Sequence, residues 1–136
     1  MRFLDTNIIV RYLTRDDEEK AAACYELFQR LKHGTEEVTT CEAVIAEVAY
    51  VLASRAHYAL SHEQVRARLA PILALRGLKI PNRRVYLRAL DLYASYRFLD
   101  IEDALLLAHM ERRGTREIIS YDSDFDQIPG TKRLVP

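Results

Sequence analysis

The sequence lacks an excess of charge of either sign, and it lacks any long apolar run. Its 136 residues include 20 basic and 20 acidic side chains, so the formal net charge is zero. That balance favours neither a general nucleic-acid binder nor a membrane-surface protein, although a local basic patch is compatible with it. No apolar stretch approaches the length that spans a bilayer, and the first residues form a strand pattern rather than a signal peptide. We therefore expect a cytoplasmic protein without a membrane span.

Cysteine is scarce, and no cysteine or histidine has the spacing of a metal-ligand set. Cys24 and Cys41 are the two cysteines, and we expect both to be free thiols in a reducing compartment. The four histidines are scattered along the chain: His33, His57, His62 and His109. The sequence also has no P-loop and no GxGxxG motif, which argues against P-loop nucleotide hydrolysis and a dinucleotide cofactor.

Strand and helix patterns alternate along the chain, which is typical of an α/β domain. Short extended segments are predicted at residues 2–4, 37–40, 78–80 and 117–120, with a last edge strand at 133–135. Apolar spacing predicts helices, counted with their caps, at about 5–13, 16–32, 39–57, 61–77, 82–96 and 100–114, with Pro71 expected to kink or split the fourth of them. The length and the hydrophobic fraction of 49% suit one domain over residues 1–136.

Several helix starts carry recognisable capping patterns. A capping side chain precedes a Glu or Gln by three residues in three places: Asp16 with Glu19, Thr39 with Glu42, and Ser61 with Gln64. The acidic residues at these positions are interpreted as solvated helix starts rather than as metal ligands.

Four other acidic residues stand at strand ends or on apolar helix faces. Asp5 and Asp122 follow the carboxyl ends of apolar strands, whereas Glu47 and Asp103 interrupt apolar stripes. No basic residue lies within a turn on the same face as Glu47 or Asp103, and an uncompensated carboxylate on a core face is costly. Because parallel strands with right-handed crossovers end on one rim of a sheet, all four carboxylates can meet there.

Simpler structural roles stay open for some of these acids and their neighbours. Asp5 or Asn7 can cap the helix that follows the first strand, and Asp100 is a natural cap of a later helix. Asp124 and Asp126 can form separate salt bridges or caps.

A cluster of carboxylates is tolerable if a cation lies among them, because like charges repel. Oxygen ligands without a companion His or Cys favour Mg²⁺ or Mn²⁺ over zinc. A hard dication held in this way commonly serves phosphoryl chemistry, since it activates water and neutralises charge on a phosphodiester.

Four short segments, in this order, resemble the acidic motifs of the PIN-domain ribonucleases. They are Phe3-Leu4-Asp5-Thr6-Asn7, Val44-Ile45-Ala46-Glu47-Val48, Leu99-Asp100-Ile101-Glu102-Asp103-Ala104 and Ser120-Tyr121-Asp122-Ser123-Asp124-Phe125. In length and motif order the chain is most similar to the VapC toxins of bacterial and archaeal toxin–antitoxin pairs. The resemblance implies a three-layer α/β/α sandwich with a central parallel sheet, and cleavage of RNA with Mg²⁺ or Mn²⁺.

Carried over by position, the resemblance also implies roles for individual residues. The metal-binding and catalytic acids are Asp5, Glu47, Asp103 and Asp122. Supporting residues are Asp100, Asp124, Thr6, Asn7 and Ser120, the last of which stands where the family commonly has a Thr. The resemblance further implies a homodimer and a cognate antitoxin that blocks cleavage, but it does not identify the RNA target.

Two other functions are compatible with the same residues. One is a phosphatase or DNA nuclease that uses the same carboxylates. The other is a non-catalytic PIN-fold module that binds RNA or protein, and the intact set of four acids speaks against it.

Substrate binding and dimer formation have candidate residues of their own. Phosphate contacts require positive charge near the acids, for which the candidates are Arg11, Arg15, Arg83, Arg84, Arg112, Arg113 and Arg116, although such residues are more often simply solvated. Tyr12, Tyr121 and Phe125 are candidates either for stacking on bases or for core packing.

A dimer interface is predicted on residues 65–78 and on Tyr86, Tyr93 and Tyr96, which alternatively cover the core.

Overall fold

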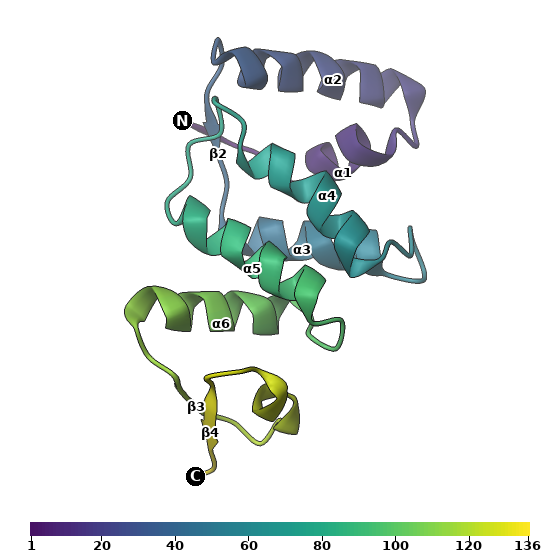
Figure 1. Cartoon of the computed structure of the whole chain (residues 1–136). Coiled ribbons are helices and arrows are strands. Elements are labelled where there is room, and N and C mark those ends of the chain that lie inside the picture. Colours follow the sequence, from purple (N-terminus) through teal and green to yellow (C-terminus); the bar gives the residue numbers. More distant parts are fainter.

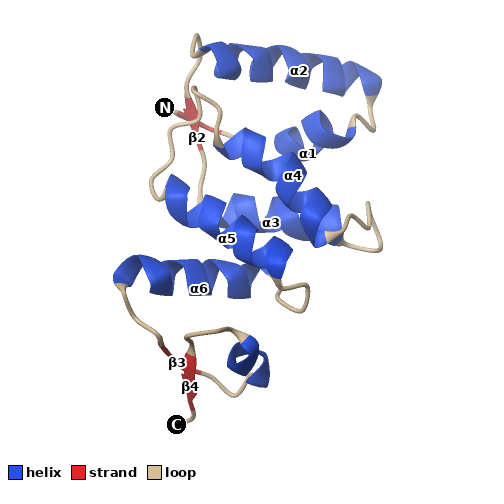
Figure 2. Cartoon of the chain, in the orientation of Figure 1, coloured by secondary structure: helices blue, strands red, loops and turns tan.

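The computed structural model describes residues 1–136 as a stack of six helices with two short strand pairs (Figures 1 and 2). Its elements in chain order are β1 (Arg2–Phe3), α1 (Thr6–Thr14), α2 (Glu18–His33), β2 (Val38–Thr39), α3 (Glu42–Ala53), α4 (His62–Leu73), α5 (Arg83–Ser95), α6 (Ile101–Arg113), β3 (Glu117–Ile119), the 3-10 helix η1 (Ser123–Gln127) and β4 (Lys132–Leu134). The α/β class predicted from the sequence is confirmed.

The strands form two separate parallel pairs. β1 pairs with β2, with Arg2 opposite Val38, and β3 pairs with β4, with Glu117 opposite Lys132. The extended segment predicted at 78–80 is reduced to one parallel bridge between Leu78 and Val38. Parallel pairing is therefore confirmed, but the strands do not form one continuous sheet, because α3, α5 and α6 lie between β1 and β3 (Figure 1).

One hydrophobic cluster of 31 buried residues connects both ends of the chain. Near the amino terminus it contains Phe28, whose ring stacks on Tyr12 with 4.1 Å between centroids. The segment 117–134, which we call the C-terminal unit, joins the same cluster through Ile118, Phe125 and Ile128. The packing alternative therefore holds for Tyr12 and Phe125.

The segments predicted to form a dimer interface instead pack mainly inward. On α4 the buried residues are Val65, Leu69, Ile72 and Leu73. Tyr86 and Tyr93 of α5 are also buried, and the Tyr93 ring stacks on the His62 ring at 3.8 Å. Burial, aided by the nearby charges of Asp100 and Glu102, raises the pKa of Tyr93 to about 12. These side chains cover the core, so the core-packing alternative holds for them.

The caps predicted for the starts of α2 and α4 agree with the structure in one case and differ in the other. Ser61 and Gln64 form the predicted capping box. The cap of α2 is Asp17, which accepts a hydrogen bond from the Lys20 N–H, so the prediction at Asp16 was wrong by one residue. Asp16 instead accepts from the Tyr58 hydroxyl at 2.6 Å.

The predicted capping box at the start of α3 was wrong. Thr39 lies in β2, and α3 begins at Glu42 with Cys41 at its cap position, so Thr39 and Glu42 do not form a capping box. Pro71 lies inside α4, which continues to Leu73, so the proline does not split the helix.

Gly77 joins three segments of the amino-terminal half and has no space for a side chain. Its N–H donates to the Leu31 carbonyl at 2.7 Å, and its own carbonyl accepts from the Val38 N–H at 2.8 Å. A Cβ at this position would overlap the Glu36 carbonyl oxygen and lie 2.9 Å from the Leu31 Cα. Only glycine allows this close approach of backbones.

We predict that Gly77→Ala lowers the free energy of unfolding more than Gly114→Ala. The first substitution forces backbone atoms apart, whereas a Cβ at Gly114 meets nothing within 4 Å. Gly114 has φ of 73°, so alanine there costs only the left-handed backbone penalty of about 1–2 kcal/mol. Urea denaturation of both variants measures the difference, and equal losses would contradict the packing argument.

Candidate active site

The predicted site residues fall into two groups in this structure. The first group lies where β1 leads into α1 and meets α3, and it contains Asp5, Thr6 and Glu47. The second group lies at the start of α6 and at the end of β3, and it contains Asp100, Asp103 and Asp122. The strands β1 and β3 are separated by the helical stack (Figure 1), whereas α3 and α6, which carry Glu47 and Asp103, pack against each other.

Asp5 occupies the cap position of α1 without acting as its cap. Leu4 before it is buried, while Asp5 itself is exposed. Its backbone is extended, but its side chain accepts no capping hydrogen bond from the helix. The capping alternative for Asp5 therefore fails, and its carboxylate is free for another role.

Thr6 connects α1 to α3 through Glu47. The Thr6 hydroxyl is in a buried residue, 8% exposed, and donates to Glu47 Oε2 at 3.0 Å. The buried face of α3 consists of Ile45, Val48, Ala49 and Leu52. Glu47 thus lies beside the apolar stripe and is exposed, so the prediction that it interrupts the core face was wrong. The Thr6 hydrogen bond fixes one oxygen of its carboxylate.

In the second group, carboxylates crowd around the half-buried Asp103. Asp100 caps α6 by accepting from the Asp103 N–H at 2.8 Å. Burial is the first cause that raises the pKa of Asp103 to about 6, and the charges of Asp100, Asp122 and Glu102 act in the same direction. No basic side chain opposes these effects. A carboxyl group in this environment is a candidate functional group.

Asp122 belongs to a tight turn after β3. Its N–H donates to the Ser120 hydroxyl at 3.0 Å, and its side chain accepts from the Asp124 N–H at 2.9 Å. Ser120 and Asp124 thus position Asp122 through local bonds. Asp126 forms an ion pair with Arg133 at 3.0 Å, which confirms the salt-bridge alternative for Asp126. Asn7 is an exposed residue of α1.

The two groups do not form a single ligand set in this conformation. No three carboxylate, imidazole or thiol side chains lie close enough together to hold one ion. The prediction that all four acids surround one ion is therefore not met here, because Asp5 follows β1, Asp122 follows β3, and these strands do not pair. The candidate ligands nevertheless suit a hard dication, since all of them are carboxylate oxygens. One of them, Asp103, is repelled by the neighbouring carboxylates, and a bound cation would relieve that repulsion.

A groove of about 700 Å³ lies between α3 and α6, and we call it the α3–α6 groove. Its lining includes Glu42, Glu47, Tyr50, Glu102, Leu106 and His109. Within it His109 Nε2 lies 2.7 Å from Glu42 Oε1. The groove contains Glu47 from the first group and runs to Glu102 beside Asp103. Sequence reasoning missed the His109–Glu42 pair, since these residues are 67 positions apart and neither has a local signal.

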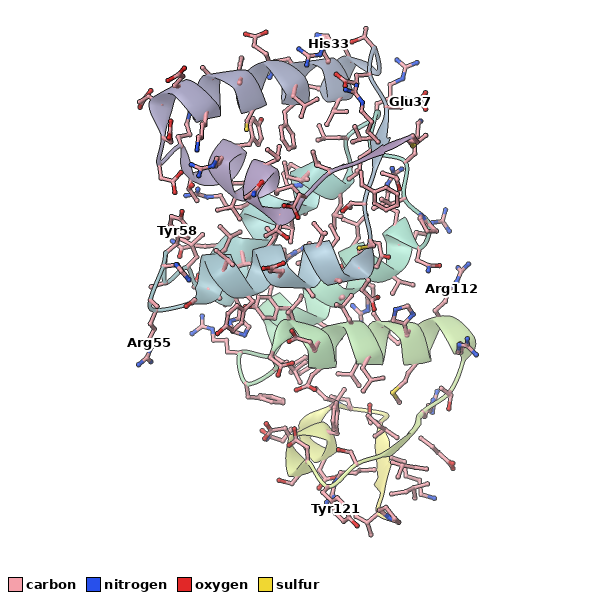
Figure 3. The ribbon with its side chains drawn as sticks, turned by 180° about the vertical axis from the view of Figure 1, so that it is seen from behind. His33, Glu37, Arg55, Tyr58, Arg112 and Tyr121 are labelled. Carbon is pink, nitrogen blue, oxygen red and sulfur yellow. The ribbon has the colours of Figure 1, made fainter.

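The candidate RNA-binding arginines are mostly not beside the acids. Arg11 lies 3.7 Å from Asp16 and 3.9 Å from Asp17. Arg112 and Arg113 end α6, about 20 Å from its acidic start by helix geometry, and Figure 3 shows Arg112 projecting at that far end. Tyr121 is open to solvent at the tip of the C-terminal unit (Figure 3), so it alone of the aromatic candidates is free to stack on a base.

We predict that Asp103 makes the metal-free protein less stable as pH rises from about 4 to about 6. Its pKa is raised from 3.8 to about 6, so in this window the folded chain binds the proton more tightly than the unfolded chain. Above about pH 6 the contribution of Asp103 to the free energy of unfolding no longer changes with pH. Denaturation in EDTA at several pH values measures it as the difference between the native protein and Asp103→Asn. An identical pH dependence in the two proteins would contradict the crowding.

Comparison with known proteins agrees with the motifs and the fold. A family profile for the PIN domain matches residues 2–131. A search of curated proteins found no match. None of the helices is both long enough and apolar enough to cross a membrane. PIN domains have a nuclease-type fold, and they commonly depend on divalent metals. Because the match covers nearly the whole chain, this protein belongs to the PIN-domain family.

Proposed function

We propose that this protein is a metal-dependent endoribonuclease that hydrolyses RNA phosphodiester bonds with Mg²⁺ or Mn²⁺. The observation that carries the proposal is the crowding of Asp103 by Asp100 and Asp122, with no basic side chain acting on Asp103 itself. Such crowding destabilises the fold, and a hard dication relieves it. In a PIN-domain chain, Asp5, Glu47, Asp103 and Asp122 are the residues proposed to hold the ion.

In the proposed hydrolysis, Glu47 and a bound dication have different roles. The dication supplies an activated water and neutralises charge on the phosphate when it is bound. Thr6 holds Oε2 of Glu47, while Oε1 has no partner in the protein. Oε1 is thus the proposed acceptor for the proton of the attacking water. The water oxygen forms the new bond to phosphorus, the ester P–O bond breaks, and the departing oxygen takes a proton from solvent.

The proposed biological role is that of a toxin in a type II toxin–antitoxin pair. Family membership and the order of the four acidic motifs support this role. The toxin would form a homodimer and be held inactive by a small cognate antitoxin. A basic side chain of that antitoxin would compete with the cation at the carboxylates. RNA is therefore the proposed substrate, and the antitoxin is the proposed protein partner.

We predict that Asp103→Asn lowers RNA cleavage by at least about 100-fold, because it removes a ligand of the catalytic ion. Its metal-free form should be as stable as the native protein or more so, since the amide abolishes the repulsion from Asp100 and Asp122. Cleavage is measured with RNA, DNA and phosphate monoesters, each with Mg²⁺, with Mn²⁺ and with EDTA. Asp91→Asn, which affects an exposed pair with Arg66, is the matched control and should cleave normally.

Each other outcome of that assay selects a different function. Faster cleavage of DNA or of monoesters would replace the ribonuclease proposal with a DNA nuclease or a phosphatase. Binding of RNA without cleavage under any metal condition would identify a non-catalytic PIN-fold module. Loss of folding in Asp103→Asn would show that Asp103 serves the structure.

We also predict that purification from the native host brings down a small second protein that suppresses cleavage. The physical reason is that a basic partner segment neutralises the same carboxylates that hold the ion. Mass spectrometry identifies the partner, and adding it back to the isolated enzyme tests inhibition. Isolation of a fully active chain without a partner would count against the toxin role.

A further inference from the structure

The start of α5 and the end of α6 lie at the same edge of the molecule, on the left in Figure 1. A pocket of about 210 Å³ lies between these two helices. Its charged lining consists of Arg84 and Arg88 from α5 and of Glu111 and Arg112 from α6. Two buried apolar residues complete the lining. We call Arg84, Arg88 and Arg112 the α5–α6 arginine cluster.

The carboxylate in this pocket neutralises only one of the three arginines. Glu111 accepts hydrogen bonds from Arg88 Nε at 2.7 Å and from Arg88 Nη2 at 3.0 Å, so this pair has no net charge. Arg84 and Arg112 are both exposed, and neither forms an ion pair. The pocket therefore carries two positive charges that no carboxylate of the protein balances.

The first turn of α5 adds to the positive potential of the pocket. Arg83 and Arg84 lie in that turn, which contains no acidic residue and has no side-chain cap. Because the amino terminus of a helix carries partial positive charge, cations are unfavourable there and anions are favourable. The Arg83 guanidinium donates through Nη2 to the Leu78 carbonyl, and its Nε is buried without a partner. An anion beside this turn would offset a charge arrangement that the protein leaves uncompensated.

Two further arginines continue the positive surface toward the C-terminal unit. Arg113 is the last residue of α6, and Arg116 follows it before β3. Both are exposed, and neither forms an ion pair. Arg116 lines a second pocket, which shares Glu111 with the first one. Positive charge therefore continues from the start of α5 across the end of α6.

The chemistry of this surface favours an anionic polymer over an apolar protein partner. Protein interfaces usually have an apolar centre, but none of the large exposed apolar side chains of the chain lines this pocket. The planar guanidinium of arginine presents several N–H donors in a geometry that suits phosphate. A nucleic-acid strand carries a negative charge on every phosphate, so one strand can contact several separated arginines.

The distance along α6 separates the arginine cluster from the acids. Arg112 follows Asp103 by nine residues on this helix, which corresponds to a rise of about 14 Å. A phosphate bound at the cluster is therefore not the phosphate that is cleaved at Asp103.

We propose that the α5–α6 arginine cluster binds the phosphate backbone of the RNA substrate away from the cleaved bond, so that the substrate is held at two points. The preferred substrate is then an RNA long enough to extend from Asp103 to Arg112, rather than a dinucleotide. This inference deepens the proposed function and rests on it for the identity of the polymer.

A binding measurement in EDTA tests the cluster without cleavage. Fluorescence anisotropy follows a labelled single-stranded RNA, much longer than the span on α6, at several salt concentrations. Arg84→Gln with Arg112→Gln should raise the Kd on the order of 10-fold at low salt. The slope of log affinity against log salt should fall by about 1.4, since each lost phosphate contact to a single strand removes about 0.7.

Two other double variants serve as controls for this measurement. Arg84→Lys with Arg112→Lys keeps both charges and should retain most of the salt slope. Lys20→Gln with Arg55→Gln removes two other exposed charges that form no ion pair, and it should leave binding nearly unchanged. Figure 3 shows Arg55 on the opposite side of the molecule from Arg112.

A cleavage assay tests whether the cluster acts outside the catalytic centre. On the long RNA, Arg84→Gln with Arg112→Gln should raise KM on the order of 10-fold and leave kcat unchanged, because a remote phosphate contact is equally strong in the ground state and the transition state. A dinucleotide is too short to reach the cluster, so the variant and the native protein should cleave it at the same rate.

The outcomes separate this inference from the proposed function. If the glutamine variant binds RNA as well as the control with Lys20→Gln and Arg55→Gln, the inference is refuted, even where the protein cleaves RNA. If its binding is weakened but the native protein cleaves no RNA with any metal, the inference stands and the nuclease proposal fails. Equal displacement of the RNA by polyglutamate at the same concentration of charge would identify a site for an acidic polypeptide and overturn the assignment to RNA.

Discussion

The two faces of α6 determine where the second group of acids can lie. Ala104 and Ala108 are buried, while Leu107 and Met110 line a pocket together with Ile128 of the C-terminal unit. Once that packing is made, Asp103 in the first turn must sit between the capping Asp100 and the turn that carries Asp122. The apolar burial of a helix therefore compensates for an unfavourable charge arrangement at its start, which is the usual relation between a fold and a strained functional site.

Capping and ligation are divided among the acids of the site. Asp100 and Asp122 each accept a backbone N–H and so stabilise a helix start. Asp5 stands in the same kind of position and accepts none, and Asp103 lies inside its helix rather than at the cap. Asp100 and Asp122 thus flank Asp103, whereas Asp5 lies in the first group, next to Thr6 and its partner Glu47. This division gives the site rigid neighbours for carboxylates that are themselves free to bind an ion.

The local features of this chain were readable from its sequence, whereas the long-range ones were not. Alternating patterns predicted the α/β class, and the Ser61–Gln64 box was found where expected because such signals act within one turn. The stacking of Tyr93 on His62 and the His109–Glu42 pair join segments far apart in the sequence, so no local pattern predicts these partners. The face of α3 was misjudged by one helical position, because Ala46 and Tyr50 are apolar but face the α3–α6 groove. The separation of β1 from β3 is likewise a long-range feature, which the periodicity of the sequence does not encode.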